Sequence, residues 1–314
     1  MGSSVIGNLD SQVWKMMGIH VEKKDKEADK VNILVTGVTG QLGYDVCREL
    51  ERRNIDYLGT SSIDFDITDK EETKSFIQQY NPTAVIHCSA YTAVDKAEEE
   101  PEKCFAVNEA GTQNVAEACK ELSCKMLYIS TDYVFLGIGE QPYEVHDETA
   151  PQNTYGKSKL AGEKIVKELL DKYFIVRISW VFGINGNNFV KTMLRIGQDK
   201  EEINVVADQV GSPTYTADLA VLLCDIIMSE KYGVYHAANE GFCSWAEFAE
   251  EIFKASGCKT KVNPISAKEY PAKAMRPENS RMSKVKLEEN GFKKLPAWQD
   301  AVKRFLDENN LANK

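Results

Sequence analysis

Short apolar runs alternate with helix-patterned stretches along the first half of the chain. Residues 31–36 form an apolar run that is long enough for a buried strand and too short for a helix. Residues 41–53, which follow, carry apolar positions at helical spacing. The alternation continues, with strands expected at 55–58, 84–88, 125–130 and 174–178 and helices at 69–80, 101–122 and 155–170. Buried strands alternating with amphipathic helices predict an α/β fold whose parallel sheet is covered on both faces.

The pattern loosens after residue 183. Helices are expected at 188–196, 217–228, 245–256 and 297–309 and a strand at 234–238, and Pro264, Pro271 and Pro277 indicate loop. We therefore expect a Rossmann-type, doubly wound dinucleotide-binding domain at 31–183, to which residues 215–238 return. Residues 184–314 are expected to form mainly a smaller, mixed α/β substrate-binding lobe. Residues 1–30 contain a highly charged stretch and no apolar signal core, so we expect a disordered extension there.

Composition narrows the class of protein. The 314 residues are 43% hydrophobic and 27% charged, with a formal net charge of −10, which argues against a nucleic-acid or anionic-membrane surface. None of the eight cysteines forms a Cys-x-x-Cys pair, so free thiols in a reducing compartment are expected rather than zinc ligands. No apolar run approaches the roughly 20 residues that cross a bilayer. We expect a soluble, cytoplasmic protein.

Three glycines join the first expected strand to the first expected helix. Gly37 permits a tight turn, Gly40 leaves the backbone open to a pyrophosphate at the helix N-terminus, and Gly43 allows close helix packing. The spacing is G-x-x-G-x-x-G rather than G-x-G-x-x-G. A helix entry without a ligand is the alternative. The position between strand and helix favours dinucleotide binding.

Cofactor choice depends on the end of the second strand. Hydroxyl residues occupy positions 60–62 and the first acid is Asp64, so a 2′-phosphate is tolerated, although no arginine selects it. We expect NADPH, with NADH also accepted. Asp66 and Ile67 are placed near the adenine; alternatively, Asp66 only caps the helix expected to begin near Thr68.

A tyrosine and a lysine share one face of the helix expected at 155–170. Tyr155 and Lys159 lie four residues apart, and a neighbouring ammonium is expected to bring the phenol pKa nearer to neutrality. The lysine also reaches toward the nicotinamide ribose. Thr131 or Ser130, at the end of the fourth strand, is placed to hydrogen-bond a substrate carbonyl oxygen. A surface helix with tyrosine and lysines is the ordinary alternative, but the glycine turn and the hydroxyl pair favour a carbonyl reductase.

Longer motifs connect these features. They are ILVTGVTGQLG at 33–43, HCSAYTAVDKAE at 87–98, NEAGTQNVAEAC at 108–119, STDYVF at 130–135, PQNTYGKSKLAGE at 151–163, RISWVFG at 177–183, DQVGSPT at 208–214 and RPENS at 276–280. With these motifs the chain resembles the extended short-chain dehydrogenase/reductase superfamily and, within it, the dTDP-4-dehydrorhamnose reductases. The resemblance spans residues 32–307.

The resemblance implies NADPH- or NADH-dependent reduction of the C4 keto group of dTDP-4-dehydro-6-deoxy-L-mannose to dTDP-L-rhamnose, for polysaccharide biosynthesis. Tyr155 would donate the proton, Lys159 would support it, and Thr131 would hydrogen-bond the carbonyl. The expected cofactor-binding residues are Gly37, Thr39, Gly40, Gln41, Leu42, Gly43, Asp66, Ile67, Ala90, Tyr91, Thr92, Tyr155 and Lys159. The expected substrate-binding residues are Val94, Asp95, Trp180, Gln209, Pro213, Thr214 and Arg276, within a pocket that includes the 208–214 segment.

Some of these positions have a structural alternative. Trp180 lies against the sugar in this interpretation, or belongs to the core. Asn108 supports the active site, or is a polar position on a long helix. Where family members read STDYVFDG, this chain has Leu136 before Gly137, which puts one loop contact in doubt.

No metal is expected in catalysis. Some family members form a dimer bridged by magnesium, and the matching position here is Asp45 rather than glutamate. A magnesium ion at a dimer interface, and the choice between monomer and homodimer, therefore stay open.

Two other functions remain as alternatives. One is a sugar-nucleotide epimerase or dehydratase of the same superfamily, which retains NAD through each turnover. The other is a non-catalytic regulatory subunit with the same fold, against which the intact Thr131, Tyr155 and Lys159 weigh.

Overall fold

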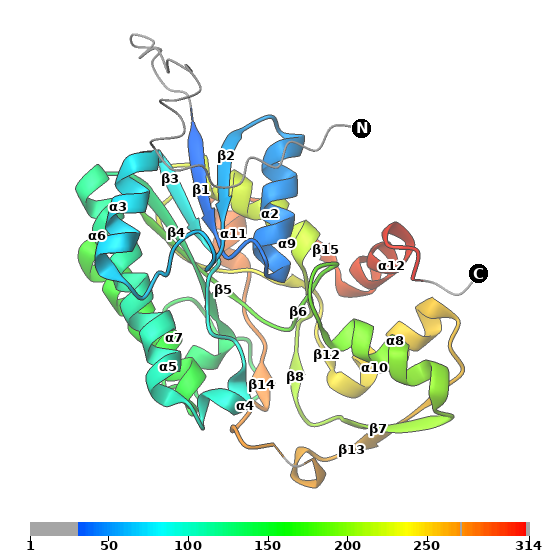
Figure 1. Ribbon diagram of the computed structural model, residues 1–314. Helices are drawn as coiled ribbons and strands as arrows, with labels where there is room; N and C mark the ends of the chain where they lie inside the picture. The colour runs from blue at the N-terminus through cyan, green and yellow to red at the C-terminus, as the bar shows by residue number, and fades with distance from the viewer. Residues whose placement is uncertain (1–30, 271, 312–314) are drawn as a thin grey trace. The chain divides into compact units, whose positions relative to one another are not determined.

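A six-stranded parallel sheet forms the centre of one half of the molecule, the sheet half (Figure 1). The computed structural model describes residues 31–270 and 272–311, so the extension expected at 1–30 lies outside the described residues. The strands run in the order β2-β1-β3-β4-β5-β10, and every neighbouring pair is parallel. Their bounds are β1 Asn32–Thr36, β2 Asp56–Thr60, β3 Ala84–His87, β4 Lys125–Thr131, β5 Tyr173–Ile178 and β10 Gly233–His236.

Helices cover both faces of this sheet, as the alternating pattern predicted (Figure 1). On one face α2 (Gln41–Arg52) packs against α9 (Thr216–Ile227). On the other face α6 (Thr112–Leu122) packs between α3 (Lys70–Tyr80) and α7 (Thr154–Leu169). The fold is therefore a three-layer, Rossmann-like α/β arrangement.

The strand order places a crevice at the carboxyl ends of the strands. From β1 the chain moves to β2 on one side and then crosses to β3 on the other side, so the connections diverge at β1. Ligands of doubly wound sheets bind at such a switch point. Four of the side chains at these strand ends, Thr36, Thr60, Ser130 and Thr131, are buried hydroxyls.

The long helix expected at 101–122 is interrupted. A short helix, α5 (Pro101–Phe105), continues into a π-helical segment at Ala106–Gly111 before α6 begins. A π-helical turn has the wider i→i+5 hydrogen bond and occurs frequently at functional sites. Apolar periodicity does not register this change, because the chain stays helical throughout. Asn108 lies on the π-helical segment.

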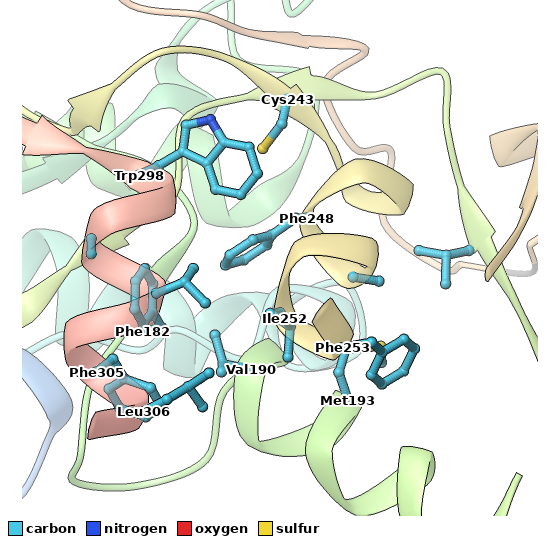
Figure 2. Close-up of a cluster of buried hydrophobic side chains, with 14 of the residues drawn as sticks. Phe182, Val190, Met193, Cys243, Phe248, Ile252, Phe253, Trp298, Phe305 and Leu306 are labelled. Atoms are coloured by element: carbon cyan, nitrogen blue, oxygen red, sulfur yellow. The ribbon is translucent and has the colours of Figure 1, made fainter. Parts of the chain in front are cut away.

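The C-terminal part has its own hydrophobic core, enclosed by helices α8 (Phe189–Asp199), α10 (Trp245–Ser256) and α12 (Trp298–Glu308) (Figure 2). Aromatic side chains dominate it: the Phe248 ring lies between those of Phe182, Phe189 and Trp298. Short strands and the short helix α11 (Val285–Glu289) complete this part, whereas the short helix α4 (Val94–Ala97) follows β3 and contacts α7 in the sheet half. The strands are β6 Val181–Phe182, β7 Glu202–Val206, β8 Val210–Gly211, β9 Thr214–Tyr215, β11 Asn239–Glu240, β12 Cys243–Ser244, β13 Lys261–Ile265, β14 Asn279–Ser280 and β15 Leu295–Ala297.

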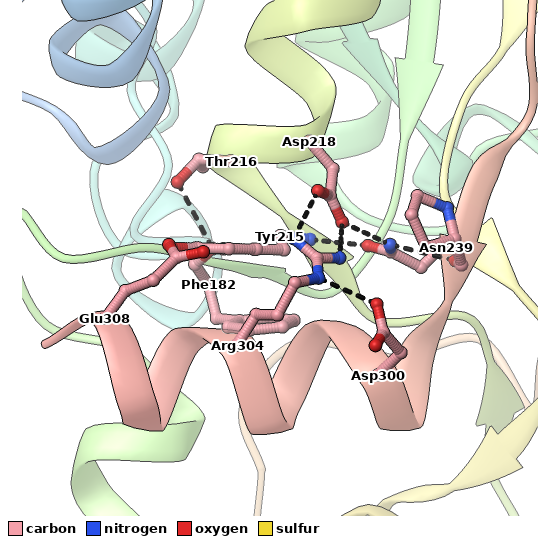
Figure 3. A network of polar contacts seen from close by, with 9 residues as sticks. Phe182, Tyr215, Thr216, Asp218, Asn239, Asp300, Arg304 and Glu308 are labelled. Carbon is pink, nitrogen blue, oxygen red and sulfur yellow. Dashed lines mark hydrogen bonds and ion pairs between the residues drawn. The ribbon is translucent and has the colours of Figure 1, made fainter.

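Polar contacts join this C-terminal part to the sheet half (Figure 3). Arg304 on α12 makes two 2.7 Å hydrogen bonds to the carboxylate of Asp218 on α9. Asp218 also accepts a hydrogen bond from Asn239. Because α9 packs on the sheet helix α2 and β10 pairs with β5, residues 216–236 return to the sheet half. By their contacts, the residues from Asn32 onward belong to one unit. Within the described ranges, no helix is long and apolar enough to cross a membrane.

Candidate active site

The glycine turn lies between β1 and α2. Gly37 has a φ of +74°, and a Cβ there would meet the backbone of Ser89 at 2.7 Å. A Cβ on Gly43 would lie 2.4 Å from the carbonyl oxygen of Gly37, so the first turn of α2 folds directly onto the loop. Gly40 is the exposed N-cap residue of α2 and has no side-chain cap. The helix N-terminus is therefore open to an anion, as the sequence predicted.

A cavity of about 540 Å³ extends from this turn across the carboxyl ends of the strands. It is large enough for a cofactor. Its lining includes Gly37, Thr39, Gly40, Gln41, Leu42, Gly43, Asp66, Ile67, Ala90, Thr92, Val94, Thr131, Tyr155, Lys159 and Trp180, all of them residues that the sequence singled out. The glycine turn and the tyrosine–lysine pair thus share one cavity.

The end of the cavity near β2 is polar but not basic. Ser61 is held by Asp64, whose carboxylate accepts hydrogen bonds from the Ser61 amide at 2.8 Å and its hydroxyl at 3.0 Å. Asp66 lines the cavity and accepts two bonds from Thr68. The N-cap of α3 is Asp69, one residue before the helix begins at Lys70, so Asp66 does not cap the helix. Lys159 is the one Lys or Arg residue among the described lining residues.

The hydroxyl and the phenol meet at the other end of the cavity. Thr131 and Tyr155 both line this end of the cavity, and hydrogen bonding by the Thr131 hydroxyl partly offsets the rise in the pKa of Tyr155. Asn153 caps α7 by accepting the Gly156 amide at 2.8 Å, and a Cβ on Gly156 would lie 2.3 Å from the Tyr133 carbonyl oxygen. This close approach brings the start of α7, with Tyr155, against the segment that follows β4.

Burial controls the charge states of the tyrosine–lysine pair. Lys159 is 2% exposed, and desolvation lowers its pKa to about 7, although the nearby Glu163 carboxylate opposes the shift. Its Nζ lies 4.0 Å from the centre of the Tyr128 ring. The pKa of Tyr155 is raised, with burial as the main cause. The expected lowering of the phenol pKa by the ammonium is therefore wrong for the free protein, because burial raises this pKa.

A buried ion pair lies beneath these residues. Glu163 follows Lys159 by one helical turn and is fully buried, with two hydrogen bonds of 2.8 Å from the guanidinium of Arg177 on β5. It also accepts the Ser130 hydroxyl at 2.6 Å. Ser130 therefore points to Glu163 rather than to a substrate, which leaves Thr131 as the hydroxyl beside Tyr155. The network joins α7, β4 and β5.

Asn108 supports the loop after β3. Its side chain accepts the Tyr91 amide at 2.8 Å and donates to the Tyr91 carbonyl oxygen at 3.0 Å. It also donates to the Ser158 hydroxyl on α7 at 2.9 Å. The loop at 90–92 and the helix that carries Tyr155 are thereby connected. The structure thus favours the supporting role among the two alternatives for Asn108.

Several expected ligand-binding residues lie outside the lining of the cavity. The side chain of Tyr91 hydrogen-bonds Glu100. Asp95 and Arg276 form an ion pair of 2.7 Å with each other. The remaining residues of this group are Gln209, Pro213 and Thr214.

The segment at 208–214 supports the cavity wall from behind. Thr214 is fully buried, and its hydroxyl donates to the Ser179 carbonyl oxygen at 2.6 Å. Asp208 accepts bonds from Ser266 and Ala267. A Cβ on Gly211 would lie 2.9 Å from the ring of Trp180. These contacts are structural.

Trp180 belongs to the C-terminal core and also reaches the cavity. Its ring stacks on that of Trp245 with centroids 3.6 Å apart, and it also lines the cavity. Its φ of +49° is unusual for a residue with a side chain. Trp180 thus joins the C-terminal core to the cavity.

Two departures from the family pattern can also be placed. Leu136 is 40% exposed, next to Gly137, whose φ is +79°. Asp45 is 3% exposed and accepts bonds from Thr216 at 2.5 Å and Arg48 at 3.2 Å. Because the Asp45 carboxylate is buried and hydrogen-bonded within the chain, it is not exposed at the surface where a magnesium ion between two subunits would bind. Among the described residues, no group of three or more His, Cys, Asp or Glu residues is placed to hold a metal.

The sequence interpretation missed two features of the site. Glu163 and Arg177 stand in quoted motifs, but only the adjacency of α7 and β5 pairs them. Asp132 was passed over although it follows Thr131 directly. The sequence feature that could have identified Asp132 is an acidic residue at the end of a buried strand.

The fold and the site define a class: a dinucleotide-binding α/β protein with a hydroxyl, a tyrosine and a lysine at the carboxyl edge of its sheet. Residues 31–311 match the family model described as RmlD substrate binding domain. The chain belongs to this family.

Named relatives and a solved structure agree. The chain is 38% identical to the spore coat polysaccharide biosynthesis protein SpsK of Bacillus subtilis, over 89% of this chain and 98% of the relative. It is 37% identical to the dTDP-4-dehydrorhamnose reductase of Escherichia coli, over 88% of this chain and 98% of the relative. The crystal structure of dTDP-4-dehydrorhamnose reductase from Bacillus anthracis, in complex with NADP, is 45% identical, with a TM-score of 0.87 over 89% of this chain and 100% of that chain.

Proposed function

We propose that this protein is an NADPH-dependent oxidoreductase that reduces the C4 keto group of dTDP-4-dehydrorhamnose to give dTDP-L-rhamnose. One observation carries the proposal: Tyr155 and Thr131 share a single cavity with Lys159 and the glycine turn. That arrangement brings a proton donor and a hydride site together. The reductases named above, similar over nearly the whole described chain, supply the substrate class.

The residues present fit a nicotinamide dinucleotide. Gly40 leaves the N-terminus of α2 open to a pyrophosphate, and the cavity continues from there both to Ser61 and to Lys159. The NADP complex of the Bacillus anthracis protein supports NADPH. Because no arginine or lysine among the described lining residues lies at the Ser61 end, we propose that NADH is also accepted. Bound reduced cofactor would supply the hydride.

The chain's own residues handle the proton. Tyr155 is kept protonated by its buried surroundings and donates its phenolic proton to the oxygen of the keto group as that oxygen gains charge. Lys159, charged below a pH of about 7, stabilises the phenolate that remains. Thr131, which lines the cavity with Tyr155, offers a hydrogen-bonding partner for the reacting oxygen.

The sugar nucleotide is proposed to enter on the side of Val94 and Trp180. Trp180 presents an aromatic face in the cavity wall, which suits a sugar ring. The Asp95–Arg276 ion pair lies near this region, because Asp95 follows Val94. Arg276 is proposed to leave its ion pair with Asp95 when the substrate binds and to contact the diphosphate of the sugar nucleotide instead.

The test is a cofactor-oxidation assay with a panel of dTDP-, GDP- and UDP-linked 4-keto sugars. We expect loss of the reduced-nicotinamide absorbance with the dTDP-linked 4-keto sugar and dTDP-L-rhamnose as the product. Turnover without added reductant, on a protein purified with bound NAD, would instead indicate an epimerase or dehydratase. Cofactor binding without turnover on any sugar would indicate the regulatory subunit.

A further inference from the structure

Asp132 is a buried carboxyl group in the wall of the cavity for which the proposed reaction has no use so far. It is 3% exposed and lines the cavity next to Thr131 and Tyr133. Carboxyl groups are rarely buried without a charged partner. A buried acid at a reaction site is therefore a candidate for a functional role.

Two hydroxyl groups hold this carboxyl. The Thr131 hydroxyl donates to Oδ1 at 3.0 Å, and the Ser280 hydroxyl, from β14, donates to Oδ2 at 2.5 Å. Thr131, Asp132 and Tyr155 all line this cavity, and the Thr131 hydroxyl acts to lower the pKa of the Tyr155 phenol. The Thr131 hydroxyl, bonded to the carboxyl, is therefore the group through which a proton could pass from Asp132 to the phenol.

Among the residues that the structure describes, no cation compensates the charge of Asp132. Within the described ranges it takes part in no ion pair, and the titratable groups that face it are Tyr133, next in the chain, and Tyr155, from α7. Arg276 lies near Tyr133 but pairs with Asp95. Burial raises the pKa of Asp132 to about 6, so both of its protonation states are populated close to neutral pH.

We propose that Asp132 is a positioning residue that returns a proton to Tyr155 through the Thr131 hydroxyl after each reduction. The inference rests on the proposed function. The hydride passes from the reduced nicotinamide to the carbonyl carbon, and the phenolic proton of Tyr155 passes to the carbonyl oxygen. The Thr131 hydroxyl proton then moves to the phenolate while the carboxylic proton of Asp132 moves to the Thr131 oxygen. The resulting carboxylate takes up a proton from water, which completes the balance of one hydride and one proton.

The need for a relay follows from the burial of the phenol. Because the pKa of Tyr155 is raised, its phenolate is costly and must be reprotonated before the next turnover. The Asp132 carboxyl is the acid best matched to that task, since its pKa lies near neutrality. Direct reprotonation from water or from Lys159 is the competing route, and it predicts no effect of removing the carboxyl.

The first test is Asp132→Asn, which keeps the shape and two hydrogen-bonding atoms but cannot deliver a proton. In rapid mixing, we expect the first turnover to keep its wild-type rate, because it uses the proton already on Tyr155. Steady-state kcat should then fall about 10²-fold, with cofactor affinity unchanged. Unchanged kcat overturns the relay. A first turnover slowed as much as the steady state also overturns it, because that result indicates a misplaced Thr131.

The second test is Ser280→Ala, which leaves the carboxylate with one hydrogen bond fewer. The relay needs protonated Asp132, so wild-type kcat should fall as pH rises through the pKa of this group. Ser280→Ala should raise that pKa and move the fall upward by roughly one pH unit or more. Coincident profiles for the two proteins contradict the relay. Absence of wild-type turnover on every 4-keto sugar defeats the proposed function itself, whereas an active wild type with an unaffected Asp132→Asn variant defeats the relay alone.

Discussion

At the scale of single residues, burial is the main influence on the chemistry of Tyr155 and Lys159. The two residues share one face of α7, and pairing alone predicts a phenol that ionises more easily. In the structure, desolvation keeps the phenol protonated and lowers the pKa of the lysine. A phenol kept protonated is suited to donating a proton, which is the role that a ketone reduction requires.

Tyr155→Phe should remove the proton donor without changing the shape of the cavity. We expect kcat to fall by about 10²- to 10⁴-fold, with the dissociation constant of NADPH nearly unchanged. Steady-state kinetics and a cofactor fluorescence titration measure the two quantities. Turnover at the wild-type rate would exclude Tyr155 as the acid.

Lys159 should cost the protein stability in a pH-dependent way. Its pKa is lowered to about 7 in the folded state but is ordinary, near 10.4, in the unfolded chain. Between these values the unfolded state binds more protons, so stability is lost as pH falls from 10 to 7. Lys159→Met should therefore raise the free energy of unfolding at pH 7, and this gain should shrink toward pH 10. Urea unfolding at both pH values tests this; a gain independent of pH contradicts it.

At the scale of elements, two glycines in the turn between β1 and α2 are required for different physical reasons. Gly43 lies against the carbonyl of Gly37, whereas a Cβ on Gly40 would meet that oxygen only at 3.2 Å, on an exposed residue with ordinary φ. Packing of the helix on the turn requires Gly43, and access for a phosphate group requires Gly40.

Gly43→Ala and Gly40→Ala should therefore differ. We expect Gly43→Ala to lower the free energy of unfolding by about 1–3 kcal/mol, because the added methyl must push the turn away, and to weaken cofactor binding as well. Gly40→Ala should weaken cofactor binding with little change in stability. Thermal unfolding and NADPH titration of both variants decide this. Equal losses of stability in the two variants would contradict the assignment of Gly43 to packing and of Gly40 to phosphate access.

At the scale of the whole molecule, aromatic packing and polar contacts hold α12 against the rest of the chain. Phe305 is fully buried, and its ring makes edge contacts with those of Phe182 and Tyr215. The Tyr215 hydroxyl also donates to Glu308 at 2.8 Å (Figure 3). The last helix is thus an integral part of the C-terminal core.

Phe305→Ala should lower the free energy of unfolding by about 3–5 kcal/mol, because it leaves a cavity among these rings. Phe305→Leu, the matched control, keeps most of the apolar volume and should cost less than about 1.5 kcal/mol. Denaturant unfolding of both variants measures the difference. A loss that is the same for leucine and alanine would contradict the packing argument.

The sequence by itself determined the sheet strands, the main helices and the glycine turn. These features depend on residues that are neighbours in the chain, so apolar periodicity and glycine spacing report them directly. Strand β3 and helix α10 lie where the pattern placed them to within a residue. The apolar pattern did not predict the π-helical segment around Asn108, because this pattern is the same as that of an ordinary helix.

Only the tertiary structure decided the surroundings of the chemical groups. The chain separates Glu163 from Arg177 by 14 positions and Asp132 from Ser280 by 148, and the strand order and the C-terminal lobe bring them together. The protonation states of Tyr155 and Lys159 depend on how much water the surrounding elements exclude, which no local pattern contains. The sequence named the reacting side chains because their types and spacing are local properties. Their pKa values, and the buried carboxyl beside them, follow from contacts between distant segments.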